Sequence, residues 1–290
     1  MLNILHLSDL HFGQPYLPRV GEAVLRTAHA MGPDLLVISG DVTQRAKRRE
    51  FEAVRAYFDR LPDIPRIVVP GNHDVPLYRV WERLWCPHRL YQQYIAQTLN
   101  TVVRRDDAII VALDTSSPYR AITNGRIRAK QLDLCTEAFT HAPANVYRIV
   151  VMHHHLAPAP DYDTSEMMPK AKQILETLTA LKVDLIMAGH LHRAYIGNSL
   201  DIYGGADREH GIIIAQCGTT TSRRGRARER EKNSFNWIQL TEQSIRIIHY
   251  MYFTDQDDFA AISQHEFARP SRGILRIGLK PTLKDEVTRT

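Results

Sequence analysis

The segment 67-IVVPGNHDVP-76 joins an apolar run to a sharp polar turn. Three consecutive β-branched residues are typical of a buried β-strand, and the Pro-Gly pair that follows breaks the chain at once. The turn then presents Asn72 and His73. The segment therefore predicts either an ordinary turn or the end of a strand that directs polar side chains at a ligand.

Short apolar runs of the same kind recur along the chain, and helical patterns separate several of them. The runs are 2-LNILHL-7, 34-DLLVIS-39, 65-PRIVV-69, 108-AIIVAL-113, 147-YRIVVM-152, 183-VDLIMA-188 and 211-GIIIAQ-216. Helical spacing is followed by Val20, Val24, Leu25, Ala28 and Met31, and again by Phe51, Val54, Phe58 and Leu61. This alternation predicts an α/β fold whose strands are buried on both faces.

The pattern changes after residue 210. The runs 235-FNWIQL-240 and 245-IRIIHYMYF-253 flank the turn-like 241-TEQS-244, which predicts a hairpin that completes a second sheet. From Asp255 onward the sequence is more polar and poorly periodic, so residues 255–290 are interpreted as a C-terminal extension.

Composition bounds the class of protein. The chain has 290 residues, 44% of them hydrophobic, which is enough for one large core or two small ones. Its apolar stretches are too short to cross a bilayer and its first residues lack a signal pattern, so we expect a cytoplasmic protein. Three scattered cysteines suggest no disulfide framework and no thiolate metal site. A formal charge of +5 favours anionic partners.

Polar side chains follow five of the predicted strands. The endings are 8-SDLH-11, 39-SGD-41, 71-GNHD-74, 153-HHH-155 and 189-GHLH-192. Each alone could be a helix cap, a turn or a satisfied core histidine. Five together favour a functional site, because open α/β sheets build their sites at the C-terminal ends of strands.

The donor types point to metal ions. Imidazole, carboxylate and amide groups without thiolate suit Mn²⁺, iron or Zn²⁺ better than Cu(I), Mg²⁺ or Ca²⁺. The number of donors fits two ions better than one. A pair of ions about 4 Å apart can hold a bridging hydroxide and clamp a phosphoryl centre during in-line displacement.

The ordered motifs resemble those of the calcineurin-like metallophosphoesterase superfamily. Asp-x-His, Gly-Asp, Gly-Asn-His-Asp, a later His and Gly-His-x-His run in that order from Asp9 to His192. The resemblance implies a four-layer αββα sandwich of two mixed β-sheets flanked by helices. It implies a catalytic domain over residues 1–254. The segments 4-ILHLSDLHFG-13, 153-HHH-155 and 217-CGTTTSRRGR-226 are most similar to the bacterial cyclic-nucleotide phosphodiesterase branch.

The resemblance also implies a set of metal ligands. One ion would be held by Asp9, His11 and His192, a second by Asn72, His153 and His190, and Asp41 would bridge them. His153 matches the family position as the first histidine after its strand, and His154 is the alternative. The ions would be Mn²⁺ or an iron and manganese pair, with Zn²⁺ as a further option.

The resemblance gives His73 a role outside metal binding. It would contact the substrate phosphate and help to stabilise charge or to protonate the leaving oxygen, and we expect Asp74 to orient its imidazole. The ions would lower the pKa of a bridging water, whose hydroxide attacks phosphorus opposite the leaving oxygen.

Two segments are candidates for choosing the substrate. Residues 77–97 crowd aromatic and basic side chains, including Arg79 and Arg83, after the catalytic turn. A helix that packs its aromatic stripe on the core is the preferred interpretation, and a cap over the substrate is the alternative. The second segment, 223-RRGRARERE-231, begins with Arg223 and Arg224 and suits phosphate binding if it is more than a solvated loop.

The preferred hypothesis is hydrolysis of a cyclic nucleotide or a related small diester. Alternatives are a UDP-2,3-diacylglucosamine-type lipid pyrophosphate hydrolase, which would work peripherally at the inner face of the membrane, and a DNA nuclease. Nucleic acid is disfavoured because acidic residues interrupt the basic run and no aromatic residues alternate with it. A non-catalytic metal-binding interaction module is the alternative of another class, and it is disfavoured because no ligand of the motif is missing.

Overall fold

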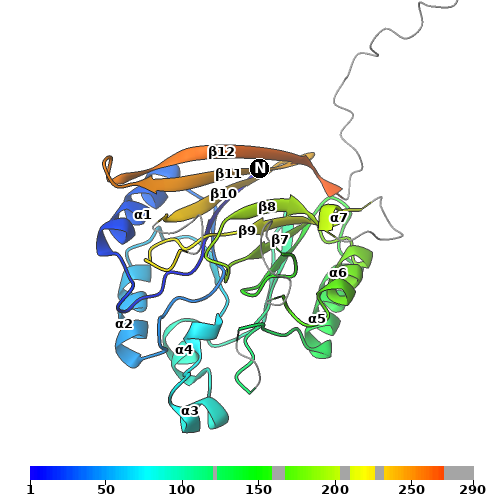
Figure 1. The fold of residues 1–290 in the computed structure, drawn as a ribbon. Helices are drawn as coiled ribbons and strands as arrows, with labels where there is room; N and C mark the ends of the chain where they lie inside the picture. Colours follow the sequence, from blue (N-terminus) through cyan, green and yellow to red (C-terminus); the bar gives the residue numbers. More distant parts are fainter. Residues whose placement is uncertain (120–122, 159–166, 203–209, 226–231, 271–290) are drawn as a thin grey trace, which may run out of the picture.

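The apolar runs of the sequence form the strands of two six-stranded sheets packed face to face (Figure 1). The structure is a computed structural model, and it describes residues 1–119, 123–158, 167–202, 210–225 and 232–270. Helices cover both outer sides of the sheet pair. The α/β prediction and the four-layer sandwich implied by the resemblance are therefore confirmed.

The first sheet combines parallel and antiparallel strands in the order β12-β11-β10-β1-β2-β3. Its parallel strands β1, β2 and β3 come from the N-terminal part of the chain, and β10, β11 and β12 add antiparallel neighbours on the other side of β1. The bounds are β1 Leu2–Leu7, β2 Leu35–Ile38, β3 Arg66–Val68, β10 Ser234–Leu240, β11 Ser244–Phe253 and β12 Asp258–Ala268.

The second sheet has the order β4-β5-β6-β7-β9-β8. Its four central strands are parallel, and an antiparallel strand closes each edge. The bounds are β4 Thr101–Arg104, β5 Ala108–Ala112, β6 Tyr147–Val151, β7 Leu185–Ala188, β8 Tyr195–Asn198 and β9 Ile213–Gln216. Each apolar run identified in the sequence forms a strand, and the two edge strands β4 and β8 were not predicted from the sequence.

Alternation along each strand divides the core into layers. In β1, Leu2 and Ile4 face the interior between the sheets, whereas Leu5 and Leu7 face the helices. This period of two follows from the pleat of an extended chain. The interior cluster takes side chains from both sheets, including Ile149, so the two sheets share one apolar interface.

Two helix pairs cover the sheets. α1 (Pro18–Met31) and α2 (Arg48–Phe58) pack on the first sheet, and α5 (Ala129–Thr140) and α6 (Ala171–Ala180) pack on the second (Figure 1). α1 begins at Pro18, whose fixed φ and missing N–H suit a first turn, and ends at Gly32 with a φ of 57°. Short helices complete the described chain: η1 Asn72–Asp74, α3 Val80–Trp85, α4 Arg89–Tyr94 and α7 Ser199–Ile202.

The C-terminal strands differ from the sequence expectation in where they attach. The hairpin of β10 and β11 does not complete the second sheet. It joins the first, because β10 pairs antiparallel with β1 from Leu2↔Leu240 to His6↔Asn236. Its apolar residues Ile238, Ile245 and Ile247 then complete the interior between the sheets.

Part of the expected C-terminal extension also belongs to the first sheet. β12 pairs along β11, and Arg269 just beyond it is buried, with its guanidinium bonded to the carbonyls of Asn145 and Val146. Polar residues on β12 obscured it in the sequence, since an edge strand with one exposed face carries few apolar side chains. Residues 271–290 lie outside the described residues, and the division of the chain into domains stays a prediction.

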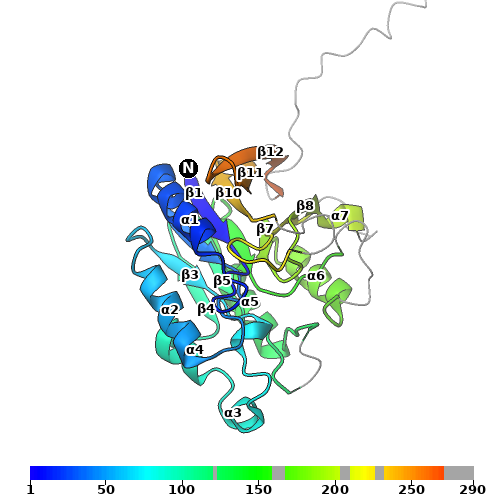
Figure 2. The same ribbon diagram turned by 60° about the vertical axis from the view of Figure 1, so that its left-hand side comes forward.

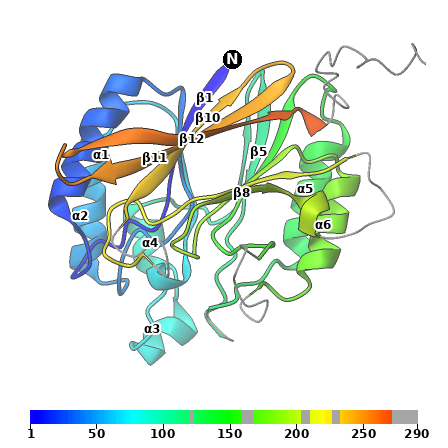
Figure 3. The same ribbon diagram turned by 45° about the horizontal axis from the view of Figure 1, so that its top comes forward.

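The aromatic segment after the catalytic turn forms two short helices with different environments. α4 packs on the first sheet's helix layer and buries Leu90 and Tyr91, as the core interpretation predicted. α3 buries no residue, so the same interpretation is wrong for that helix. Figures 1, 2 and 3 all show α3 projecting away from the sheets.

Candidate metal centre

The predicted ligands meet where the C-terminal ends of parallel strands from both sheets converge. Each sits two to four residues beyond the end of its strand. They are Asp9 and His11 after β1, Asp41 after β2, Asn72 after β3, His153 after β6, and His190 and His192 after β7. The four-layer packing thus brings together turns that are far apart in the sequence.

The first group consists of Asp9, His11, Asp41 and His192. One donor atom from each lies within 4.8 Å of the others, and all four side chains are buried. The Nε2 atoms of His11 and His192 are 2.9 Å apart, and His192 Nε2 lies 3.1 Å from Asp9 Oδ1.

The second group consists of His153, His154 and His190, also buried, with donor atoms within the same distance. Asn72 belongs beside them: its Oδ1 lies 3.2 Å from His153 Nε2 and 3.1 Å from His190 Nδ1. Asp41 touches both groups, because its Oδ2 lies 3.7 Å from His11 Nε2 and 3.3 Å from His153 Nε2.

Hydrogen bonds outside the groups fix which atom of each ligand faces inward. Asp9 Oδ2 accepts from the Ser8 hydroxyl at 2.6 Å, so Oδ1 faces the first group. His153 Nδ1 bonds the Ser39 carbonyl at 2.7 Å and His192 Nδ1 bonds the Arg224 carbonyl at 2.7 Å. A carbonyl can only accept, so each of these two rings carries its proton on Nδ1 and turns Nε2 inward. This is how outer partners orient metal-binding imidazoles.

The donors fit cations. Among the described residues, the buried oxygens Asp9 Oδ1 and Asp41 Oδ2 accept no hydrogen bond. Buried carboxylate oxygens are normally satisfied, because an unpaired one costs the desolvation of a charge. A cation would satisfy both oxygens and would also accept the lone pair that His192 Nε2 turns inward.

The protonation states of the ligands suit cations too. Burial lowers the pKa of His11 to about 3, and burial with neighbouring histidines lowers the pKa of His190. Burial alone would raise the pKa of Asp41, but the charges of His153 and His73 hold it well below its usual range. Burial alone would lower the pKa of His153, but the Asp41 carboxylate raises it to about 9. A cation at this position would compete with protons for the His153 ring, because a metal-binding imidazole must be neutral.

Backbone strain is concentrated at the same residues. Five predicted ligands have a positive φ, namely 52° at Asp9, 49° at His11, 51° at Asp41, 78° at His190 and 53° at His192. Left-handed backbone at a residue other than glycine costs on the order of 1–3 kcal/mol and persists only where the surroundings enforce it. Such outliers cluster at functional sites, which supports the assignment of this edge.

Two glycines allow the turns to approach each other. Gly40 has a φ of 96°, and a Cβ there would meet the His153 ring. A Cβ on Gly71 would overlap Asp41 Oδ1. Gly40 is therefore needed both for its backbone conformation and for packing, whereas Gly71, with a φ of −102°, is needed for packing alone.

His73 lies against the first group without belonging to it. Its ring meets the His11 ring edge-on, with centroids 4.9 Å apart, and the His73 backbone N–H donates to Asp41 Oδ1 at 2.8 Å. Its Nδ1 bonds the Gln44 carbonyl at 2.9 Å, so the proton of the neutral ring sits on Nδ1 and Nε2 is the free acceptor. Burial lowers its pKa, and the nearby Arg224 charge adds to the effect.

The expectation that Asp74 orients the His73 imidazole is wrong. The Asp74 carboxylate turns the other way and accepts from Gly71 N, Val42 N, Thr43 N and Thr43 Oγ1 at 2.8–3.2 Å. The Gln44 carbonyl orients the ring instead. Asp74 sits in the 3₁₀ turn Asn72–Asp74, which points adjacent side chains in different directions. Its role is to hold the turn after β3 against the turn after β2.

Asp74→Ala should therefore act on stability. Four buried donors would lose their acceptor, and we expect the free energy of unfolding to fall by about 3 kcal/mol or more. Urea denaturation followed by circular dichroism measures this. The exposed Asp106 offers a matched control, and Asp106→Ala should stay within about 0.5 kcal/mol of the parent chain. A loss below about 1 kcal/mol for Asp74→Ala would contradict the role of Asp74 in holding the two turns together.

The arginines predicted to contact substrate are placed unequally. Arg224 lies at the site, where its carbonyl accepts from His192 and its guanidinium donates to Gln44 Oε1 at 3.2 Å. Arg223 is exposed, and its backbone N–H bonds the Pro15 carbonyl. Arg79 donates to the carbonyls of Arg45 and Ala46, and Arg83 donates to the Pro118 carbonyl. Residues 226–231 of the basic run lie outside the described residues.

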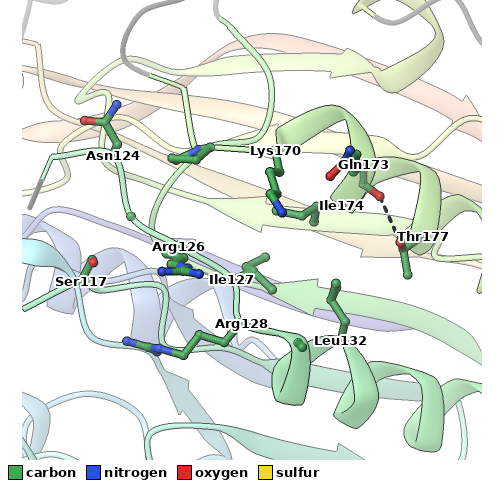
Figure 4. Close-up of a pocket in the computed structure, with 13 residues that line it drawn as sticks. Ser117, Asn124, Arg126, Ile127, Arg128, Leu132, Lys170, Gln173, Ile174 and Thr177 are labelled. Carbon is green, nitrogen blue, oxygen red and sulfur yellow. Dashed lines mark hydrogen bonds between the residues drawn. The ribbon is translucent and has the colours of Figure 1, made fainter. Parts of the chain in front are cut away.

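A cavity of about 710 Å³ lies at the N-terminal ends of α5 and α6. Figure 4 shows Arg126 and Arg128 on one wall, Lys170 and Gln173 on the other, and Ile127, Leu132 and Ile174 between them. Gly125 in its lining packs against His154, whose ring lies 4.6 Å from that of His190. The cavity combines three cationic side chains with an apolar floor and adjoins the second group at His154.

Several supporting residues were not identified from the sequence. They act through backbone atoms or single hydroxyls, which leave no spacing pattern. They include Ser8 on Asp9, Ser39 on His153, Thr43 on Asp74 and Gln44 on His73.

Buried carboxylates and imidazoles at an edge shared by two sheets define a metal-dependent phosphoester hydrolase. The chain belongs to the calcineurin-like phosphoesterase family, whose model matches residues 2–194. The resemblance drawn from the motifs is therefore confirmed.

Two curated relatives are both named probable cyclic nucleotide phosphodiesterase. A protein of Synechococcus sp. named probable cyclic nucleotide phosphodiesterase is 27% identical over 211 residues, which cover 67% of this chain and 75% of the relative. A protein of Xenorhabdus bovienii with that name is 27% identical over 180 residues, which cover 60% of this chain and 66% of the relative.

Solved structures agree on the fold. A purple acid phosphatase from yellow lupin superposes with a TM-score of 0.70 at 11% identity, over 93% of this chain and 54% of the phosphatase. GAP50, the anchor in the inner membrane complex of Plasmodium, superposes with a TM-score of 0.60 at 15% identity, over 92% and 89%. None of the described helices is both long enough and apolar enough to cross a lipid bilayer.

Proposed function

We propose that this chain hydrolyses a small phosphodiester of the cyclic-nucleotide class at a pair of metal ions. One observation carries the proposal: the buried Asp41 Oδ2 lies within 3.7 Å of His11 Nε2 and within 3.3 Å of His153 Nε2. A carboxylate oxygen between two sets of ligands is suited to bridging two ions. The names of the two curated relatives support the substrate class.

In the proposal, Asp9, His11 and His192 hold one ion, Asn72, His153 and His190 hold the other, and Asp41 bridges them. His153 is preferred to His154 because its Nε2 faces both Asp41 and Asn72. His154 instead directs Nδ1 at the Thr115 hydroxyl, 2.8 Å away. Mn²⁺, an iron and manganese pair, or Zn²⁺ would suit this donor set. When bound, the ions supply positive charge for the phosphoryl oxygens and a water of lowered pKa.

His73 is the proposed catalytic residue. Gln44 fixes the Nδ1 proton, so a second proton can only be carried on Nε2, which is the atom free to donate to the leaving oxygen. The hydrogen bond from the His73 backbone N–H to Asp41 Oδ1 ties the position of this residue to the bridging carboxylate. Proton transfer and metal binding are thereby held in one fixed geometry.

Arg224 is the arginine best placed to contact the substrate. Its bond to Gln44 and its charge effect on His73 put it beside the catalytic ring. An arginine there can pair with a phosphoryl oxygen. The cavity of about 710 Å³ next to His154 is within the size range of small-molecule sites, and its cations suit an anionic organic ligand.

The test is a panel of substrates with the Mn²⁺-loaded protein. We expect kcat/KM to be highest for cyclic AMP, lower for bis-p-nitrophenyl phosphate, and lowest for UDP-2,3-diacylglucosamine and single-stranded DNA. Asp41→Asn protein, loaded in the same way, reports contaminating activity. A lead of orders of magnitude for the lipid or DNA substrate would overturn the substrate class. Absence of hydrolysis of every member would favour a non-catalytic metal-binding module.

A further inference from the structure

Exposed apolar side chains are concentrated on one short segment of the molecule. Six of the large apolar side chains that the described residues leave exposed lie within residues 77–85. They are Leu77, Tyr78, Val80, Trp81, Leu84 and Trp85. Trp81 and Trp85 are 76% and 79% exposed, and Tyr78 is 71% exposed. Monomeric proteins rarely leave so large an apolar group in water without a partner.

These residues form a projection with one apolar side. In α3, Val80 and Leu84, like Trp81 and Trp85, are four residues apart and share one side of the helix, with Glu82 and Arg83 on the other. No residue of that helix is buried. Figures 1, 2 and 3 show α3 as the part that extends farthest from the sheets on its side of the molecule. An amphipathic helix whose apolar side carries tryptophan and leucine is typical of helices that lie in a membrane interface.

Polar contacts fix the base of this projection. Tyr78 accepts from Arg45 at 3.2 Å, and Arg79 donates to the carbonyls of Arg45 and Ala46. Arg83 donates to the Pro118 carbonyl, and Tyr119 donates to the Leu84 carbonyl at 3.2 Å. The projection is therefore held in position between two loops while its indole rings remain outside.

The surroundings of the projection are basic. Residues 77–89 carry three arginines and one glutamate, a formal charge of +2. The adjoining residues 45–49 add Arg45, Lys47, Arg48 and Arg49. Near an anionic lipid surface each such cation contributes about 1 kcal/mol of attraction.

We propose that the α3 projection, residues 77–85, inserts into the interface of an anionic lipid bilayer. Tryptophan and tyrosine favour the headgroup region, and arginines at its base would pair with phosphate groups there. A lipid surface fits better than a protein partner, because the basic side chains around the projection complement anionic headgroups and its exposed indoles suit the headgroup region. Since Leu77 directly follows the turn that carries Asn72 and His73, binding would place the candidate site next to the membrane. The inference does not depend on the substrate proposed above.

The test uses tryptophan fluorescence and vesicle co-sedimentation of the full chain. The chain has three tryptophans, and Trp237 is only 7% exposed, so a change in emission reports Trp81 and Trp85. We expect a blue shift and co-sedimentation with vesicles of equal parts phosphatidylcholine and phosphatidylglycerol. Vesicles of phosphatidylcholine alone, or added salt, should weaken both.

Trp81→Ala with Trp85→Ala should lower the vesicle partition coefficient about hundredfold, since two buried indoles are lost. Ile262→Ala, at an exposed apolar position of β12, is the matched control and should bind as the parent chain does. Both variants should keep the circular dichroism spectrum and the rate of bis-p-nitrophenyl phosphate hydrolysis. The inference is wrong if the parent chain ignores anionic vesicles or if the double variant binds them equally well. It is also wrong if the parent forms a dimer that the double variant abolishes while neither binds vesicles, because the projection would then contact a second copy.

Discussion

Asp41→Asn is expected to lower kcat/KM for a phosphodiester by about 10³-fold or more and to reduce the metal content of the purified protein. The substitution keeps the shape of the side chain, and the amide oxygen can still accept from His73 N, so the turn should remain in place. It removes the negative charge that Oδ2 offers to both ligand groups. An amide nitrogen in that position cannot bind a cation.

Metal content by inductively coupled plasma mass spectrometry and steady-state kinetics on the same sample measure the effect. Asp106→Asn, at an exposed carboxylate, is the matched control and should retain both metal and activity. A variant of Asp41 that keeps two ions per chain and stays within about tenfold of the parent rate would exclude a bridging role.

His73→Asn is expected to separate catalysis from metal binding. The lost proton donor should lower kcat by about 10²- to 10⁴-fold, the usual contribution of general acid catalysis. Metal content should not change, because the His73 ring is held by Gln44 and is not part of either ligand group. The two measurements together distinguish a catalytic histidine from a fifth imidazole ligand.

The matched control is His141→Asn, since His141 is an exposed histidine that ends α5. Loss of one ion per chain in the His73 variant would make that residue a ligand. An unchanged kcat would remove it from the reaction. A substrate with a good leaving group, such as bis-p-nitrophenyl phosphate, should be affected less than a cyclic nucleotide, because its leaving oxygen needs less protonation.

The buried strands were predictable because each is a short apolar run bounded by breakers. β1, β5 and β6 lie within a residue or two of the runs read from the sequence. Periodicity could not place the hairpin of β10 and β11, because pairing partners are set by long-range contacts that a local pattern does not contain. It also could not find β12, whose alternation is hidden by the polar residues of an exposed edge.

Some features of the site could likewise be predicted from the sequence, and others could not. The ligand types, their order and their positions after strands were readable, since each motif is contiguous in the chain. Which atom of each ligand faces inward was not, because that depends on partners such as the Ser39 and Arg224 carbonyls. Asp74 shows the limit most clearly: it is adjacent to His73 in sequence, yet it bonds the turn after β2.

By itself, the sequence determined that five strand endings carry carboxylate, amide and imidazole groups in the order of one family of phosphoesterases. It did so because strand periodicity and turn chemistry are local properties. Only the tertiary structure decided that Asp41 lies between two ligand groups, that the Gln44 carbonyl orients His73, and that α3 exposes its tryptophans. Each of these depends on distances and exposure between segments that meet only when the two sheets pack together.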